Sequence, residues 1–281
     1  MRELENLKEA ILKDPKEFPR LEMDTEFQFS CHPGVACFNQ CCADVNIFLT
    51  PYDILRLKNR LGITSEEFLS KYTIIPFDKN IAFPVVLLKM QENEKKSCHF
   101  VTEKGCGVYE DRPWACRMYP VGLASPAGDL QGPLQKEFYF LLQEKICKGF
   151  GESKKQTLKG WLDGQGIHDY NEIGEMWKDL TLHPYLQHGN TFPPQKIEMF
   201  FTAAYNLDKF REFVFESTFL KKFVVEEDVL KKIKEDDVEL LKFGFRWLRF
   251  ALFGEKTMKV NDVVMATKES ELKAKGKIPK K

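Results

Sequence analysis

The chain has 281 residues, of which 43% are hydrophobic and 30% charged, and its formal net charge is zero. This composition is that of an ordinary globular protein, and a neutral chain has no strong global field to attract nucleic acid or an anionic membrane. Because no apolar run approaches the ~20 residues of a membrane-spanning helix, we expect no membrane association and no specific nucleic-acid partner.

The N-terminal segment, residues 1–26, is predicted to be helical because Leu7, Ile11 and Leu12 recur at helical spacing among charged residues. It has neither the apolar core nor the small-residue cleavage site of a secretory signal, which predicts a cytoplasmic protein. The compartment bears on the cysteines that follow, because cytoplasmic thiols stay reduced.

All eight cysteines lie between residues 31 and 147, a clustering that random placement would give only about once in a thousand sequences. They are Cys31, Cys37, Cys41, Cys42, Cys98, Cys106, Cys116 and Cys147. A reducing compartment argues against disulfides, whereas thiolates are soft ligands that suit zinc and iron–sulfur clusters. We therefore predict a cysteine-cluster metal-binding domain over residues 27–150.

The spacing C-x5-C-x3-C-C of the first cysteine segment fits neither a zinc knuckle nor a ferredoxin. A radical S-adenosylmethionine loop is also disfavoured, since Asp44 stands where its third cysteine would be. Neighbouring side chains in extended backbone point to opposite faces, so Cys41 and Cys42 either serve different metal ions or include only one ligand. Eight thiols suffice for two four-thiolate sites, but the count does not decide between one site and two.

Two helices are predicted directly after this segment. Residues 50–62 carry Thr50 as N-cap, Pro at the first helical position, Asp53 in the first turn and Gly62 as terminator. Thr64 and Glu67 then form a second capping box. The cysteine segment is therefore expected to be a loop held against a helical scaffold.

The second cysteine segment follows a predicted strand at residues 85–88 and a charged turn that leads into Cys98. Glycines bracket Cys106 and allow its backbone to approach a metal closely. Pro113 suits the first turn of a short helix that would carry Cys116.

Polar residues beside the cysteines are candidates for supporting roles. The guanidinium groups of Arg112 and Arg117 would favour thiolates and offset the negative charge of a thiolate cluster, unless Arg117 only forms a surface ion pair with Asp111. His32 and His99 each adjoin a cysteine and are either nitrogen ligands or neighbours of the site.

The remainder of the chain changes character twice. Residues 151–192 are rich in Gly, Lys and Pro punctuation and are predicted to be linker loops around the short element "WLDGQG". Residues 193–255 show Phe-rich helical periodicity, which indicates core packing or a binding groove, and residues 256–281 form a basic flexible tail. The predicted fold class is α+β, predominantly helical, with a small cysteine-rich region of few short strands packed on a helical domain.

The stretches "FSCHPGVACFNQCCADVNIFLTPYDILRLKNRLG" and "CHFVTEKGCGVYEDRPWACRMYP" resemble the YkgJ-type cysteine-cluster family of zinc- or iron-chelating domains. The usual pattern of that family is C-x2-C-x2-C-C, a C-x-F/L element, and C-x-V/I-Y-E-x-R-P-x-x-C-R-x-F/Y-P. The matching positions are Cys98, Phe100, Cys106, Tyr109, Glu110, Arg112, Pro113, Cys116, Arg117 and Pro120. The resemblance covers roughly residues 27 to 125.

The first segment departs from this pattern, with gaps of five and three residues where two and two are usual. The wider gap is similar to that of relatives described as flagellin lysine N-methylases. The resemblance therefore implies metal binding first, and second a protein lysine N-methyltransferase with S-adenosylmethionine as cofactor and flagellin as a protein partner. No Gly-rich loop follows a predicted strand, which counts against a Rossmann-type methyltransferase.

Three functional hypotheses follow. In the first, the cysteines hold an iron–sulfur cluster, with [4Fe-4S] favoured, or zinc, and Cys31 and Cys147 are the outlying candidate ligands. In the second, the protein is a lysine N-methylase whose cluster is structural or redox-active. In the third, it is a thiol redox sensor in which Cys41 or Cys42 is a low-pKa thiolate.

Overall fold

The computed structural model describes residues 19–76, 83–124 and 137–262. Among these, residues 19–62, 70–76 and 85–175 form one compact unit, and residues 63–69, 83–84 and 176–262 form a second. Most of the predicted N-terminal helix falls outside the described residues. Its last part, residues 19–26, is not helical, because the chain is already extended where it enters the first strand.

The first unit contains four antiparallel strand pairs and several short helices. The pairs are β1 (Glu26–Gln28) with β8 (Lys155–Thr157), β2 (Thr73–Ile74) with β3 (Leu87–Leu88), β4 (Val101–Thr102) with β5 (Gly105–Cys106), and β6 (Val121–Ala124) with β7 (Phe138–Leu141). The helices are α2 (Pro51–Leu61), α4 (Trp114–Met118) and α5 (Leu158–Gly164), with 3-10 turns η2 (Gln40–Cys42), η3 (Tyr109–Asp111) and η4 (Gly149–Gly151). Two further helices, α3 (Ser65–Tyr72) and α6 (His168–Thr181), contribute residues to both units.

The predicted helix starts are confirmed. Thr50 caps α2 by accepting the Asp53 N–H, the Asp53 carboxylate accepts the Thr50 N–H in return, and Gly62 ends the helix with a φ of 65°. Thr64 and Glu67 form the same reciprocal pair ahead of α3. The predicted strand at 85–88 is shorter than expected: only its last two residues pair, with β2.

The prediction of loops over residues 151–192 is wrong. This stretch contains β8, α5, α6 and the short α7 (Pro184–Gln187). Tyr170, Ile173 and Leu180 on α6 are buried, so burial of one helical face outweighs the glycine and the polar residues that suggested a linker.

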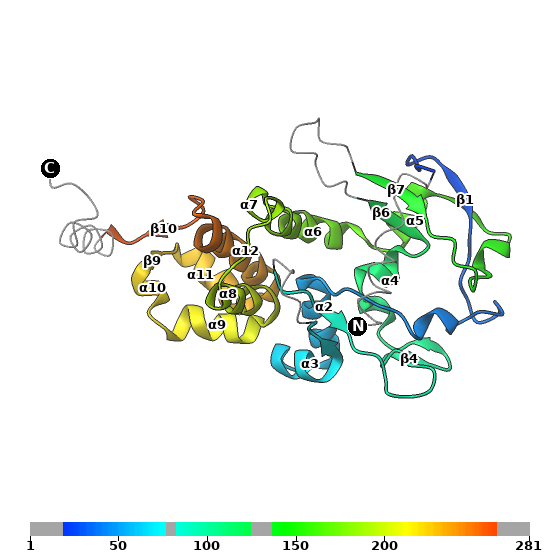
Figure 1. The fold of residues 1–281 in the computed structure, drawn as a ribbon, viewed down its shortest axis with the longest axis horizontal. Helices are drawn as coiled ribbons and strands as arrows, with labels where there is room; N and C mark the ends of the chain where they lie inside the picture. The colour runs from blue at the N-terminus through cyan, green and yellow to red at the C-terminus, as the bar shows by residue number, and fades with distance from the viewer. Residues whose placement is uncertain (1–18, 77–82, 125–136, 263–281) are drawn as a thin grey trace. The chain divides into compact units, whose positions relative to one another are not determined.

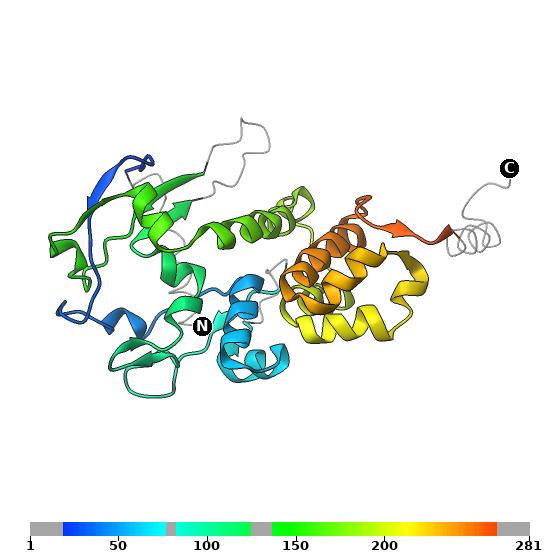
Figure 2. The same ribbon diagram turned by 180° about the vertical axis from the view of Figure 1, so that it is seen from behind.

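The second unit is a cluster of helices with an aromatic core. Its helices are α8 (Pro194–Tyr205), α9 (Leu207–Glu216), α10 (Phe219–Lys222), α11 (Glu227–Glu235) and α12 (Asp237–Phe253). Helix α12 packs against α8, α9 and α11, as the two opposite views show (Figures 1 and 2). Most of the apolar residues whose helical spacing predicted this face are buried, whereas Phe223 and Val238 are half-buried; the buried ones are Phe200, Ala204, Leu207, Phe210, Val214, Phe219, Leu241, Phe245, Leu248 and Leu252. Core packing is therefore confirmed for this face.

The predicted flexible tail is wrong for its first residues. Lys259 and Val260 form β10, which pairs with β9 (Phe223–Val224), because the turn after α12 returns the chain alongside α10. The tail beyond residue 262 lies outside the described residues. Taken together, the described elements are helices and two-stranded sheets, so the α+β, predominantly helical fold class is confirmed.

Gly244 allows α12 to approach α8 closely, and its replacement tests this packing. A Cβ at Gly244 would lie 2.7 Å from the Ala203 carbonyl oxygen, a contact that only backbone movement relieves. Although alanine is the better helix former, we expect Gly244→Ala to lower the free energy of unfolding by about 2 kcal/mol. Gly174→Ala on α6 is the matched control, since nothing lies within 4 Å, and it should stabilise. Chemical denaturation measures both; stabilisation by Gly244→Ala would contradict the close approach.

Candidate metal centre

Backbone pairing joins the two cysteine segments. Ala43 forms an antiparallel bridge with Ser97, and the Cys98 N–H donates to the Cys42 carbonyl at 2.7 Å. Asn39, in the left-handed conformation with φ 65°, donates from Nδ2 to the Thr102 carbonyl at 2.9 Å and so ties η2 to the β4–β5 hairpin. These contacts place cysteines that are some sixty residues apart in the chain side by side.

A second set of contacts brings in the last cysteine. The Ser30 N–H donates to the Gly149 carbonyl at 3.1 Å, and the Phe29 N–H donates to the Lys154 carbonyl at 3.0 Å. The close approach needs glycine, because a Cβ at Gly149 would lie 2.6 Å from both the Phe29 ring and the Ser30 carbonyl oxygen. Cys31 and Cys147, which flank these contacts, are therefore neighbours.

Four cysteines line one largely apolar cavity, and we call them the first thiol set: Cys31, Cys37, Cys41 and Cys147. The Lys148 N–H donates to the Cys37 sulfur at 3.1 Å. Burial, followed by the charges of the other three thiols, raises the pKa of Cys31 to about 11. Cys31 therefore lies close to the other three thiols of this set.

Tyr119 lines the same cavity. Its buried hydroxyl has no hydrogen-bond partner in the described part of the chain, although Cys147 lies near enough to help burial raise the pKa of the phenol. The hydroxyl is thus a donor held beside the first thiol set. Sequence analysis did not select Tyr119, and the only signal for it was its place in the C-R-x-F/Y-P motif.

The other four cysteines form the second thiol set: Cys42, Cys98, Cys106 and Cys116. The β4–β5 hairpin places Cys106 opposite Val101, three residues after Cys98, and the Phe100 N–H donates to the Cys98 sulfur at 3.4 Å. Burial first, and then the Cys106 charge, raises the pKa of Cys98.

Helix α4 delivers the fourth member of the second thiol set. Desolvation by the surrounding protein atoms is the main cause that raises the pKa of Cys116, and the charge of the Cys98 thiol is the next. Part of the Cys116 side chain is nevertheless accessible to solvent. Pro113 stands directly before α4, close to its predicted place in the first turn. The short helix carrying Cys116 was therefore predicted correctly.

Cys41 and Cys42 divide between the two sets. The expectation of extended backbone is wrong here, because residues 40–42 form a 3-10 turn, in which successive side chains diverge by about 120°. Cys41 faces Cys31, whereas Cys42 lies near Cys98 and Cys116. The Cys42 thiol donates a hydrogen bond to Cys41, which lowers the pKa of Cys41 to about 6 and raises that of Cys42.

Within each set the thiols lie near one another, but in this structure their sulfur atoms do not surround a common metal position. All eight are free, and in the described residues no three Cys, His, Asp or Glu side chains are placed to hold one metal ion. The donor chemistry fits nonetheless, because four cysteines per set is the ligand number of both a structural zinc site and a cubane iron–sulfur cluster. Metal binding would draw the sulfur atoms of each set together.

The two predicted arginines differ in their surroundings. Burial raises the pKa of Cys106 and of Cys116, and the positive charge of Arg112 opposes that rise in part. Arg117 is buried and donates to the backbone carbonyls of Glu110, Arg112 and Gln165. The alternative surface pair of Arg117 with Asp111 is wrong.

Asp111 instead binds a different arginine. Its carboxylate accepts from Arg56 Nε at 2.9 Å, and Arg56 Nη2 lies 2.6 Å from the same oxygen. This contact joins α2 to η3, the turn that precedes α4. Arg117 therefore has no part in this ion pair and donates to backbone carbonyls instead.

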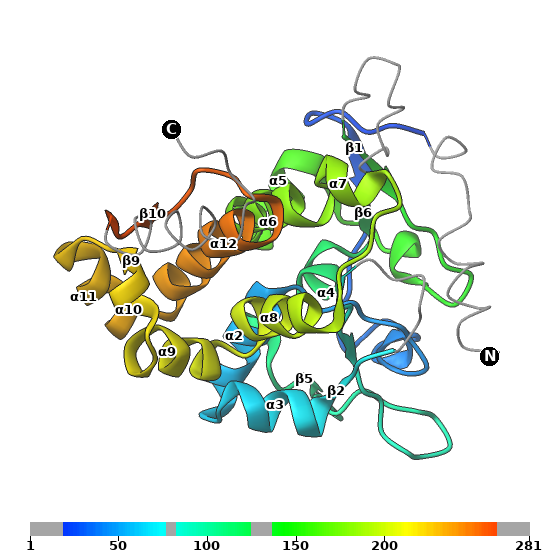
Figure 3. The same cartoon turned by 60° about the vertical axis from the view of Figure 1, so that its left-hand side comes forward.

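Asp53 joins α2 to α4, which lie next to each other in Figure 3. Its carboxylate is fully buried and accepts from Thr50 at one oxygen and from the Trp114 N–H at the other, at 2.7 Å. Burial raises the pKa of Asp53 to about 6, against the opposing effect of these hydrogen bonds. Sequence analysis identified only the capping half of this role, since Trp114 lies sixty-one residues further on.

Comparison with known proteins concerns this same cysteine-bearing segment. Residues 30–148 match the model of the CxxCxxCC family, described as "Putative zinc- or iron-chelating domain". We therefore call residues 30–148, which this family model matches, the CxxCxxCC domain. The match spans less than half of the chain, and no curated protein and no solved structure matches. It confirms the resemblance seen in the sequence and supports metal binding, without distinguishing zinc from iron.

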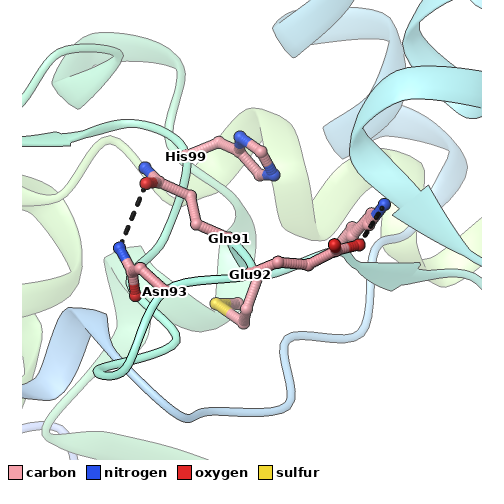
Figure 4. Close-up of a pocket in the computed structure, with 6 residues that line it drawn as sticks. Gln91, Glu92, Asn93 and His99 are labelled. Carbon is pink, nitrogen blue, oxygen red and sulfur yellow. Dashed lines mark hydrogen bonds and ion pairs between the residues drawn. The ribbon is translucent and has the colours of Figure 1, made fainter.

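The histidines of the CxxCxxCC domain have other partners or surroundings. His32 Nε2 lies 3.1 Å from the Glu152 carboxylate, and its Nδ1 accepts the Gly34 N–H. His99 packs edge-on against Tyr72 and lines an open hollow with Gln91, Glu92 and Asn93 (Figure 4). Neither imidazole lines the cavity of the first thiol set.

The sequence predicted that no segment spans a membrane. Among the helices of the described residues, none combines the length and the apolar character needed to cross a bilayer. The predicted cytoplasmic location stays a prediction.

Proposed function

We propose that the CxxCxxCC domain binds iron–sulfur through its cysteine thiolates, with [4Fe-4S] favoured over zinc. The observation that carries this proposal is the gathering of all eight cysteines, from segments more than a hundred residues apart, into two sets of four. Cysteine-only donors suit iron–sulfur clusters. Such a cluster supplies one-electron transfer or a structural cross-link.

Some of the chain's own groups oppose the burial that raises the pKa of these thiols. The Lys148 N–H donates to the Cys37 sulfur and the Phe100 N–H to the Cys98 sulfur, and the second of these hydrogen bonds favours the anionic form of Cys98. The Arg112 guanidinium, whose positive charge acts on Cys106, would offset part of the negative charge of a tetrathiolate centre. Arg117 supports this proposal only indirectly, through the backbone that carries Cys116.

Anaerobic purification followed by iron, sulfide and zinc determination and visible absorption tests the proposal. We expect iron with acid-labile sulfide and a brown protein. A colourless protein with stoichiometric zinc would replace the cluster by zinc, and a folded protein that takes up neither would overturn metal binding altogether.

Removal of the metal should lower stability. A group that binds only the folded chain stabilises it by about 4 kcal/mol when its concentration is a thousandfold above Kd. We therefore expect chelator treatment to lower the melting temperature of the first unit, with the loss reversed by reloading. Thermal unfolding before and after chelation measures this, and an unchanged melting temperature would contradict a structural contribution of the metal.

The two remaining hypotheses stay predictions. A thiol sensor would keep reactive thiols in the metal-loaded protein, so a thiol count with and without metal separates it from ligation. The lysine N-methylase hypothesis rests on the resemblance alone. Incubation with S-adenosylmethionine and flagellin, read by mass spectrometry, would show a methyl mass gain if it holds.

A further inference from the structure

We propose that the eight cysteines form two separate metal centres, the first held by Cys31, Cys37, Cys41 and Cys147 and the second by Cys42, Cys98, Cys106 and Cys116. This inference rests on the proposed metal binding and adds the number of centres and the ligands of each. The adjacent Cys41 and Cys42 would be the boundary between them.

The first centre rests on shared geometry. Its four thiols line one cavity, and the cavity walls otherwise consist mainly of apolar side chains such as Phe29, Val35 and Ile146. The cavity is formed by segments 29–41 and 146–149, with Tyr119 between them. No member of the second thiol set lines it.

The second centre is built from other elements. The Cys98–Cys42 backbone hydrogen bond, the β4–β5 hairpin and α4 supply its four positions. The largest charge effects on Cys116 come from Cys98, Asp53, Cys106 and Arg112. Each set therefore has its own scaffold and its own supporting groups.

The boundary explains why adjacent cysteines occur. A 3-10 turn separates the directions of two successive side chains, so one residue turns toward the cavity and the next toward the hairpin. Cys41 lines the cavity, while Cys42 has Cys98 and Cys116 as neighbours besides the Cys41 thiol, to which it donates a hydrogen bond. In the proposed arrangement these two neighbouring residues serve different centres, and the hydrogen bond between their thiols breaks when each binds its own metal.

Half-site variants of the full chain test the inference. The probes are anaerobic loading with ferrous iron and sulfide and, separately, with zinc alone. The wild-type chain should bind about eight iron atoms or two zinc ions. Cys37→Ser and Cys106→Ser should each retain half of the metal, and the double variant none. Loss of all metal in either single variant, or of none, would overturn two centres; a wild-type chain that binds no metal would overturn the proposed function instead.

A substitution outside the two thiol sets tests whether metal is lost from one centre only, without removal of a ligand. Gly149→Ala should push the Phe29–Ser30 backbone away from η4 and so reduce loading toward half, by weakening the first centre only. Gly151→Ala, in the same turn with nothing within 4 Å, should load fully. Circular dichroism verifies folding of both. If Gly149→Ala loads fully, or loses all metal while folded, the assignment of Cys31 and Cys147 to a separate centre fails.

Discussion

Replacing Arg117 by alanine is expected to lower the free energy of unfolding by about 4 kcal/mol. The buried guanidinium donates to three backbone carbonyls, those of Glu110, Arg112 and Gln165, and lies 4.6 Å from the centre of the Tyr170 ring. Without it, three carbonyl groups lose a charged hydrogen-bond donor. The alanine side chain does not fill the vacated volume, and water that enters would donate weaker hydrogen bonds to these carbonyls. The turn leading into α4 would loosen, and metal loading of the second thiol set should fall with it.

Arg117→Lys separates charge from hydrogen bonding. Lysine keeps the positive charge but cannot span three carbonyls with one ammonium group, so most of the loss should remain. Arg60→Ala is the control, because the Arg60 side chain is exposed and its ion pair with Asp111 is long at 3.9 Å, so the pair should be worth about 0.5 kcal/mol or less. Denaturant unfolding, with hydrogen exchange to localise the change, measures all three. Equal losses for Arg117→Ala and Arg60→Ala would contradict this role of the Arg117 hydrogen bonds.

Asp53→Ala is expected to cost about 3 kcal/mol of unfolding free energy. The change removes the reciprocal cap of α2 and leaves the Trp114 N–H without its acceptor at the start of α4. Because α4 carries Cys116, we also expect weaker metal binding at the second thiol set and unchanged binding at the first.

Glu67→Ala provides the comparison for Asp53. Glu67 makes the same reciprocal cap with Thr64, but it is solvent-exposed, so its loss should be much smaller. Asp53→Asn adds a further test, since an amide can accept only through one atom and must direct its NH2 toward a backbone donor. Hydrogen exchange over residues 50–62 and 113–118 reads the effect directly. Equal protection in Asp53→Ala and the wild type would refute the link.

Features set by neighbouring residues were predictable from the sequence. The helix at 51–61 and the capping box before α3 depend on side chains that reach their own backbone three residues away, so their signals are short and complete in the sequence. The buried faces of α8, α9 and α12 were visible for the same reason, as one helical period suffices to display them. Helix α6 carries such a period at Tyr170, Ile173 and Leu180, but glycine and His-Pro punctuation around it suggested a linker.

The partners of charged groups were not predictable. Arg117 stands directly after a candidate ligand and was expected to face it or Asp111, yet its guanidinium is held by carbonyls, one of which belongs to Gln165. Asp111 pairs with Arg56, fifty-five residues earlier. Such choices depend on which distant backbone atoms are buried nearby, and that follows from the tertiary packing.

The sequence by itself determined that a cysteine-rich CxxCxxCC domain precedes a helical, Phe-rich region, because residue type, clustering and periodicity are properties of the chain alone. Only the tertiary structure decided which thiols are neighbours. Cys31 meets Cys147 because glycine at position 149 permits close backbone contact, and the 3-10 turn at residues 40–42 directs Cys41 to the cavity while Cys42 lies near Cys98 and Cys116. Both outcomes depend on long-range packing that spacing does not encode.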